Sequence, residues 1–272
     1  MKVMVLGSGT SHGIPVVGCS CPVCTSIDPR DKRMRCSLYI EGPGEERLVI
    51  DTGPEFRLQA LRAGIKKLDA VLLTHSHADH LHGLDDVRPL CVNTPLPVYG
   101  NLPTITELRE RFSYVFNPNT QRGGGKPNLI PSIIEGPVRL GSLMAAPFPV
   151  KHGSLDILSW YISEINPGRP GQAPGSLLYM TDTSAIDKEV LAKLPQPEIT
   201  IIGGLRARPH STHFSFEEAL ETALKLKSRR VFLTHICHNH SHREIEEYCK
   251  NFMNIRGLGG IEMSPAWDGQ EL

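Results

Sequence analysis

Four potential metal ligands follow directly on a short apolar segment of the chain. Residues 70–73, AVLL, have the composition of a buried β-strand, and residues 74–80 then read THSHADH. Side chains this close in sequence converge only if the chain turns where the strand ends. The first two ligands would then face one metal ion and the last two a second, and a histidine-rich loop in solvent, the alternative, is disfavoured by the spacing. The four residues are His75, His77, Asp79 and His80.

Strand-like and helical segments recur along the chain and indicate an α/β fold. Runs of β-branched and aliphatic residues predict strands, and amphipathic spacing predicts helices between some of them. The expected strands are Val3–Leu6, Ser37–Ile40, Leu48–Ile50, Ala70–Thr74, Val98–Tyr99, Ser159–Ile162, Ser176–Met180, Ile199–Ile202 and Val231–Leu233. The expected helices are Glu55–Ala63, Thr104–Tyr114, Ser215–Lys227 and Arg243–Asn251. This order favours two sheets sandwiched between helices.

Two segments rich in glycine and proline are expected to lie outside the strands and helices. Residues 117–137 include three consecutive glycines and are expected to form a flexible insert. Residues 166–175 are expected to form the tip of a long hairpin. The length of 272 residues suits one large domain, so residues 1–272 are expected to fold as a single unit.

The charge balance limits the partners that the chain would bind. Lysine plus arginine equals aspartate plus glutamate at 29 each, which disfavours long nucleic acid and anionic membranes. We find no apolar run of the roughly 18–20 residues that a membrane span needs. Residues 1–7 are expected to form a strand, not a signal peptide, which predicts a cytoplasmic protein. The sequence is also compatible with a homodimer.

The motif His-x-His-x-Asp-His after a strand is typical of the metallo-β-lactamase superfamily, and the chain resembles that superfamily throughout its length. The resemblance implies an αββα sandwich and two catalytic divalent ions, zinc or manganese, with three further ligands that each follow an apolar strand. These ligands would be His152, the bridging Asp182, and His235. By the same resemblance Asp51 holds the histidine-rich segment by hydrogen bonds without binding metal, a plain turn aspartate being the alternative.

Within the superfamily the sequence most resembles phosphodiesterases, namely the phosphoribosyl 1,2-cyclic phosphate phosphodiesterases of the carbon–phosphorus lyase pathway and their relatives. The segments that carry this resemblance are residues 7–15, 18–24, 51–54, 208–213 and 233–238. It implies that His213 lies over the metal site, where it contacts the phosphate or protonates the leaving oxygen. His210 is the other candidate for this role, and Asp79 is expected to take part in the reaction as well as in metal binding. His12 and His82 are expected in loops or just outside the ligands.

The first three cysteines form a Cys-x-Cys-x-x-Cys cluster at Cys19, Cys21 and Cys24. This spacing is typical of a metal site, and tetrahedral zinc would need a fourth ligand. In the enzymes that the chain resembles a histidine completes a structural zinc site, which implies His238 here. His240 and His242 are competing donors in the same segment, and three unrelated buried thiols are the alternative for the cysteines.

The resemblance implies a metal-dependent hydrolase in which a hydroxide bridging two ions attacks the phosphorus of a small cyclic phosphodiester, such as phosphoribosyl 1,2-cyclic phosphate. One alternative is a tRNA 3′-processing ribonuclease, disfavoured by the neutral charge. Another is a thiolester hydrolase, disfavoured by the cysteine cluster and the His213 segment. A third is a cofactor-biosynthesis accessory protein that binds metal without turnover, disfavoured by the complete ligand set.

Overall fold

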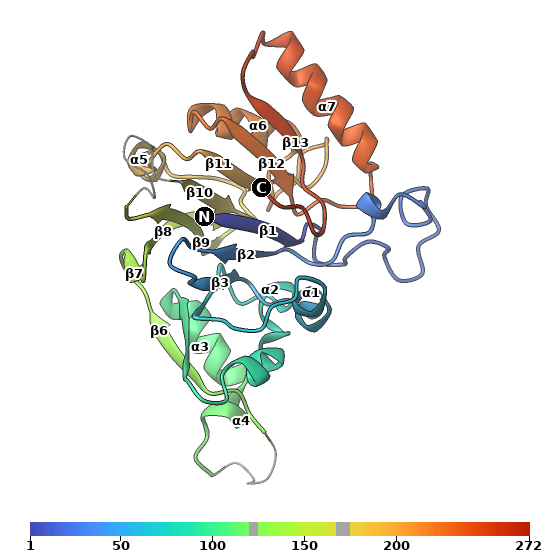
Figure 1. Cartoon of the computed structure of the whole chain (residues 1–272). Coiled ribbons are helices and arrows are strands. Elements are labelled where there is room, and N and C mark those ends of the chain that lie inside the picture. Colours follow the sequence, from blue (N-terminus) through green and yellow to red (C-terminus); the bar gives the residue numbers. More distant parts are fainter. Residues whose placement is uncertain (120–124, 167–174) are drawn as a thin grey trace.

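The computed structural model describes residues 1–119, 125–166 and 175–272. Two β-sheets face each other at the centre of the molecule, and helices cover the outer side of each sheet (Figure 1). The expected αββα sandwich is therefore confirmed. In the described part of the chain, no helix is long and apolar enough to cross a membrane.

The first sheet has six strands in the order β1-β2-β3-β4-β5-β6. Its first three strands pair antiparallel, and the pairs from β3 to β6 are parallel. The strands are β1 Lys2–Gly7, β2 Ser37–Glu41, β3 Arg47–Ile50, β4 Ala70–Leu72, β5 Leu96–Gly100 and β6 Leu129–Ile133.

The second sheet has seven strands in the order β13-β12-β11-β10-β9-β8-β7. The strands β10 to β13 pair in parallel, and β10, β11 and β12 read as largely apolar segments because helices cover one face and the other sheet covers the opposite face. The strands are β7 Val138–Leu140, β8 Leu143–His152, β9 Leu155–Glu164, β10 Ser176–Met180, β11 Ile199–Gly203, β12 Arg230–Thr234 and β13 Glu262–Pro265.

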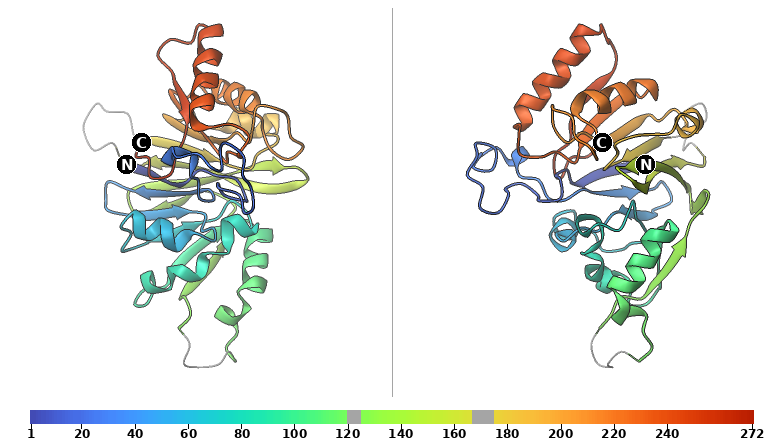
Figure 2. Two further views of the ribbon diagram at one scale, coloured as in Figure 1. Left: turned by 90° about the vertical axis from the view of Figure 1, so that its right-hand side faces the viewer. Right: turned by 180° about the vertical axis from the view of Figure 1, so that it is seen from behind.

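Helices of the N-terminal half cover the first sheet, and helices of the C-terminal half cover the second (Figures 1 and 2). The first group is α1 Phe56–Arg62, α2 Ala78–Leu81, α3 Leu102–Arg111 and α4 Ser113–Phe116, with the 3₁₀ helix Leu84–Leu90. The second group is α5 Lys188–Lys193, α6 Phe216–Lys225 and α7 His242–Ile255. Both α6 and α7 begin with a capping box, Ser215 with Glu218 and Ser241 with Glu244, which fixes where each helix starts.

Three apolar layers hold the sandwich together. Between the sheets, Ile40 and Leu48 pack with Trp160, all fully buried. A second layer joins the second sheet to α6 and α7, and a third joins the first sheet to α1 and α3. The two ends of the chain also meet, since Leu272 N donates to Val3 O at 2.9 Å. The long segment between β1 and β2, which contains the short 3₁₀ helix Pro29–Asp31, extends sideways toward the start of α7 (Figures 1 and 2).

The structure corrects part of the predicted secondary structure. The segment 117–137 is not a loop throughout, because Leu129–Ile133 form β6 and pair with β5 in parallel. Residues 120–124 of that segment, and 167–174 of the expected hairpin tip, lie outside the described residues. The helix expected over residues 104–114 divides at Phe112 into α3 and α4. The short strands β7 and β13 were not predicted.

Candidate metal centre

The predicted metal ligands lie at the ends of strands that belong to both sheets. His75 follows β4, His152 ends β8, and Asp182 and His235 follow β10 and β12. Asp182 and His235 have positive φ angles of 53° and 55°, and Asp51 after β3 has 61°. Aspartate and histidine tolerate this left-handed conformation better than branched residues, and such strain gathers at functional sites. The sharp turns direct these side chains back across the ends of the sheets.

Three histidines form the first ligand group, His75, His77 and His152. Their candidate ligand atoms all lie within 4.8 Å of one another. The ring centroids of His75 and His77 are 4.6 Å apart, and those of His77 and His152 are 5.2 Å apart. A set of imidazoles at this separation can bind one divalent ion such as zinc.

Two aspartates and two histidines form the second group, Asp79, His80, Asp182 and His235, within the same 4.8 Å limit. His80 Nε2 lies 3.1 Å from Asp79 Oδ2 and 3.2 Å from Asp182 Oδ2. The other oxygen of Asp182, Oδ1, lies 3.1 Å from His235 Nε2. The candidate ligand atoms of Asp182 and His152 also lie within 4.8 Å of each other, so the Asp182 carboxylate stands between the two groups.

Asp51 holds the histidine-rich segment by three hydrogen bonds. It accepts from Thr74 N at 2.8 Å and from Thr74 Oγ1 at 2.8 Å, and His80 Nδ1 lies 2.7 Å from its Oδ2. Because the Thr74 hydroxyl donates to Asp51, it accepts from His75 Nδ1, 3.0 Å away. Both His75 and His80 are therefore held at Nδ1 and present Nε2 as the free ring nitrogen. Asp51 itself belongs to neither ligand group.

His152 is oriented in the same way by the opposite side of the site. Its Nδ1 donates to the backbone oxygen of Thr212 at 2.8 Å, which leaves Nε2 for a ligand role. His213 follows Thr212, and its ring centroid lies 4.6 Å from that of His152. His213 also forms a third cluster with His152 and Asp182 within the 4.8 Å limit, so distance alone permits it to act as a ligand.

Electrostatics favour a cation between these side chains. Burial raises the pKa of Asp182, but the adjacent His235 and His80 outweigh burial and hold that pKa well below its usual value. Burial and neighbouring His80 lower the pKa of His75, which keeps its imidazole in the neutral form that binds metals. Burial lowers the pKa of His80, but the charges of Asp79, Asp182 and Asp51 outweigh burial and raise that pKa well above the usual value.

Unpaired ring nitrogens show that the cluster suits metal ions. His75 Nε2 and His235 Nδ1 are buried without a hydrogen-bond partner in the described residues. His80 Nε2 and His235 Nε2 are buried next to aspartate oxygens 3.1–3.2 Å away, but without hydrogen-bond geometry. A buried polar nitrogen without a partner costs about 1–3 kcal/mol, and coordination removes that cost. Mixed imidazole and carboxylate donors are typical of zinc and other borderline divalent ions. The donors present therefore fit the divalent ions that this fold implies.

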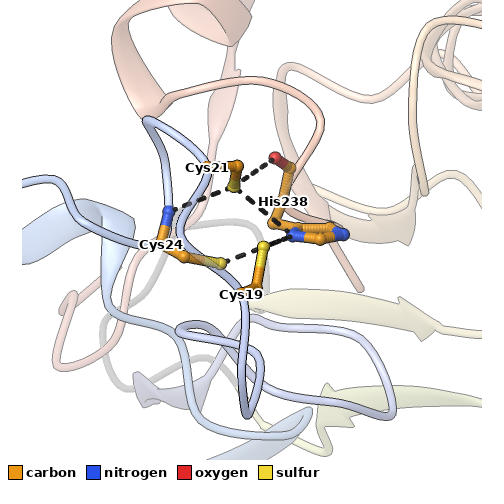
Figure 3. A group of neighbouring side chains, drawn as sticks. All are labelled: Cys19, Cys21, Cys24 and His238. Atoms are coloured by element: carbon orange, nitrogen blue, oxygen red, sulfur yellow. Dashed lines mark hydrogen bonds between the residues drawn. The ribbon is translucent and has the colours of Figure 1, made fainter.

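The cysteine cluster closes around one histidine, as Figure 3 shows. The Sγ atoms of Cys19, Cys21 and Cys24 lie 3.4, 3.5 and 3.4 Å from His238 Nδ1. Zinc bonds of about 2.3 Å to sulfur and about 2.0 Å to nitrogen in a tetrahedron would give nearly this separation. The backbone N–H of Cys24 donates to Cys21 Sγ and lowers the pKa of that thiol to about 6, which favours the thiolate.

The other histidines lie elsewhere. The His240 ring lies tilted against Phe216 with ring centroids 5.6 Å apart, and His242 is fully buried beside Arg33. Of the three donors weighed for the cysteine site, the structure brings only His238 into the cluster. His12 is exposed, and His82 is exposed beside Arg111, whose Nη1 lies 3.3 Å from His82 Nε2. His210 lies behind His213, with ring centroids 5.3 Å apart.

Sequence reasoning missed two residues that support the site. Thr74 links Asp51 to His75, and its place directly before the first ligand was the available signal. Arg111 on α3 donates from Nη1 to the backbone oxygen of Ser76 at 2.8 Å, between the first two ligands. No local sequence pattern connects Arg111 to residues 35 positions earlier.

Two facing sheets between helices, with histidines and aspartates gathered at the strand ends, define the class of metallo-β-lactamase-fold hydrolases. Residues 46–236 match the family described as the Beta-lactamase superfamily domain, and this range contains every proposed catalytic ligand. The chain therefore belongs to the beta-lactamase superfamily, as the motif predicted.

Individual relatives differ in what their names describe. An octanoyltransferase of Porphyromonas gingivalis is 38% identical over 240 residues, which are 88% of this chain and 46% of that protein. The chain thus spans less than half the length of this curated relative. A solved diphosphatase from the PhnP family has a TM-score of 0.81 and 36% identity, covering 100% of this chain and 96% of that one. The structure of zinc-bound PqqB from Methylobacterium extorquens shows the shared fold. It has a TM-score of 0.78 and 17% identity, and the match covers 100% of this chain and 99% of that one.

Proposed function

We propose that the chain is a dinuclear metal-dependent phosphodiesterase that hydrolyses a small cyclic phosphodiester such as phosphoribosyl 1,2-cyclic phosphate. The position of Asp182 carries this proposal, because one carboxylate reaches both ligand groups and suits two ions that share a ligand. Similarity to a PhnP-family diphosphatase over nearly the whole of both chains supports chemistry at phosphorus.

Each ligand group would hold one ion, and Asp182 would contact both. Divalent ions held there would supply a nucleophilic water at neutral pH and neutralise charge on the phosphate oxygens. Asp51 and the Thr212 carbonyl orient the ligand rings. Asp79 is the more exposed carboxylate, with 12% of its side chain accessible against 3% for Asp182, so it can accept a hydrogen bond from the reacting water. Neighbouring His80 outweighs burial and lowers the pKa of Asp79, which keeps it ionised for this role.

His213 would bind the phosphate by hydrogen bonding. Burial, with a further contribution from His235, lowers the pKa of His213 to about 3, so its ring is neutral near pH 7. A neutral imidazole donates one N–H hydrogen bond and carries no proton to give to a leaving group as a strong acid. Of the two roles considered for His213, this favours contact with a phosphate oxygen.

The test is hydrolysis of a substrate panel by the metal-loaded protein. The panel contains ribose cyclic phosphates, bis(4-nitrophenyl) phosphate, precursor tRNA and an octanoyl thiolester, with Asp182→Ala as the inactive control. We expect the highest kcat/KM on a cyclic phosphate and no turnover by the control. A preference for precursor tRNA or the thiolester, or no turnover of any phosphodiester, would contradict the proposal.

A further inference from the structure

Three of the proposed ligands are directly preceded by a threonine at or just after the end of a strand. The pairs are Thr74 with His75, Thr181 with Asp182, and Thr234 with His235, and all three threonines are fully buried. A buried hydroxyl needs a hydrogen-bond partner, and the partner differs among the three. The hydroxyl of Thr74 donates to Asp51, and that of Thr234 lies 3.3 Å from Cys36 Sγ. Of the three, only the hydroxyl of Thr181 donates to the side chain of a proposed ligand.

The hydroxyl of Thr181 holds one oxygen of the Asp182 carboxylate. Thr181 Oγ1 donates to Asp182 Oδ2 at 2.7 Å, the length of a hydrogen bond to a charged acceptor. The same oxygen lies 3.2 Å from His80 Nε2, and the other oxygen, Oδ1, lies 3.1 Å from His235 Nε2. The torsion that rotates an aspartate carboxylate has only a broad intrinsic preference, so a bond to one oxygen decides how the group is turned.

The backbone around Asp182 keeps the Thr181 hydroxyl in this place. Thr183 Oγ1 donates to Thr181 O at 3.0 Å, which bonds the two residues that flank Asp182 to each other. On the neighbouring strand β11, a Cβ atom at Gly203 would lie 3.1 Å from Asp182 N, so the glycine allows this strand to pass close to the turn. The turn is therefore held from two sides, and its position does not depend on the histidines of the site.

The bond from Thr181 would persist when ions occupy the ligand groups. His80 and His235 would then use Nε2 for the ions, and their present contacts with Asp182 would no longer orient its carboxylate. A carboxylate that is free to turn can bind a single ion through both oxygens. If Asp182 did so in the second group, the ion of the first group would be left with imidazole ligands alone.

We propose that Thr181 is a positioning residue that keeps the Asp182 carboxylate turned so that each oxygen serves a different ion. The inference rests on the proposed function, because it supposes a pair of ions that share Asp182. It adds that a residue outside the ligand set decides whether the carboxylate is shared. Thr181 therefore controls how tightly the more weakly held of the two ions binds.

The experiment supplies Mn²⁺ as the catalytic metal and competes for it with a chelator, while electron paramagnetic resonance follows the bound ions. Two Mn²⁺ ions that share a ligand give an exchange-coupled spectrum, and a single ion gives an uncoupled one. Thr181→Val removes the hydroxyl, and Thr181→Ser retains it. Thr234→Val is the matched control, because it removes a buried hydroxyl that lies directly before His235 and contacts the Cys36 thiol.

The variants should differ in the second ion that binds. In Thr181→Val we expect the more weakly held ion to lose about 10–100-fold in affinity, and the uncoupled spectrum to replace the coupled one. Thr181→Ser and Thr234→Val should keep the affinity and the coupled spectrum of the parent. The spectrum reports the shared ligand itself, which a general loss of stability would not change.

The outcomes separate the inference from folding and from the proposed function. Tm shows whether Thr181→Val folds, and Thr181→Ala, which also lacks the hydroxyl, takes its place if it does not. Parental affinity with a fully coupled spectrum in the variant without the hydroxyl would overturn the inference, as would an equal loss in Thr234→Val. A parent that binds a single ion would overturn the inference together with the dinuclear proposal. A parent with a coupled pair but no phosphodiester turnover would contradict the proposed function alone.

Discussion

His80 Nδ1 lies 2.7 Å from Asp51 Oδ2, and both side chains are fully buried. Asp51 directly follows β3, whereas His80 lies in α2, so this contact joins two elements at the base of the site. The same carboxylate accepts from Thr74, which makes one residue responsible for both ends of the segment from Thr74 to His80. Fixing the ring at Nδ1 leaves Nε2 pointing toward Asp79 and Asp182.

Replacing Asp51 should weaken metal binding although Asp51 is not a ligand. In Asp51→Ala, His80 and Thr74 lose their acceptor, and we expect metal affinity to fall about 10–100-fold, as for other partners of metal ligands. Competition with a chelator measures the affinity. Asp51→Asn, which keeps the volume and one carbonyl oxygen, should lose less. Unchanged metal affinity in Asp51→Ala would show that the bond to His80 is unnecessary for the site.

Arg111 should support the same segment from the outside. In Arg111→Met the Ser76 oxygen loses its donor, and we expect metal affinity to fall about tenfold, at the lower end of that range because Arg111 is exposed. Arg109→Met is the matched control on the same helix, since the Arg109 guanidinium lies over Phe116 and not on the metal segment. Equal metal affinity in the two variants would show that Arg111 does not support the metal site and contributes only a surface ion pair with Glu107.

The first four ligands could be predicted because they are encoded locally. His75, His77, Asp79 and His80 stand within a six-residue span after β4, so their spacing alone indicates ligands, whereas His152, Asp182 and His235 were identified through the resemblance. His238 required it as well, since the sequence equally offered His240 and His242, and only the fold buries His242 against Arg33. Arg111 depends on how α3 packs, which no short motif contains.

The strands β6 and β7, which the sequence did not predict, likewise depend on packing that no short motif contains. The sequence of β6, LIPSI, contains Pro131, which resembles a loop signal, yet a proline is tolerated in this strand because β6 is at the edge of its sheet. The three residues of β7 follow Pro137 and precede Gly141, and give too little alternation to detect. These edge strands form through pairing with β5 and β8 and not through their own propensity.

The cysteine cluster and the catalytic cluster should bind metal independently. We expect three ions per chain by elemental analysis, with zinc at the cysteines. Cys21→Ser should lose that zinc and lower Tm by roughly 5–10 °C, equivalent to a few kcal/mol, while the other two ions remain. Cys237→Ser is the control in the same segment, because Cys237 belongs to no ligand group. Full zinc content in Cys21→Ser would refute a structural zinc site.

Asp182 should be required at both ligand groups at once. In Asp182→Ala the second group loses the carboxylate between His80 and His235, and His152 loses its nearest anionic neighbour in the third cluster. We therefore expect reduced occupancy of both ions and turnover below detection, measured by elemental analysis and by hydrolysis of bis(4-nitrophenyl) phosphate. Near-normal turnover would mean that the two groups do not work as a pair.

His213 can act as a phosphate contact, a general acid or a metal ligand, and one variant distinguishes the three roles. In His213→Ala we expect both catalytic ions to remain and kcat to fall roughly 10²–10³-fold, as when one donor to a developing negative charge is removed. A contact from a neutral ring acts on the phosphate oxygens, so the loss should be equal for nitrophenolate and alkoxide leaving groups. General-acid catalysis would give a smaller loss with nitrophenolate, which departs without a proton, whereas a ligand role would remove metal. His210→Ala is the control, because its ring lies one step farther from His152 and should keep activity within about threefold.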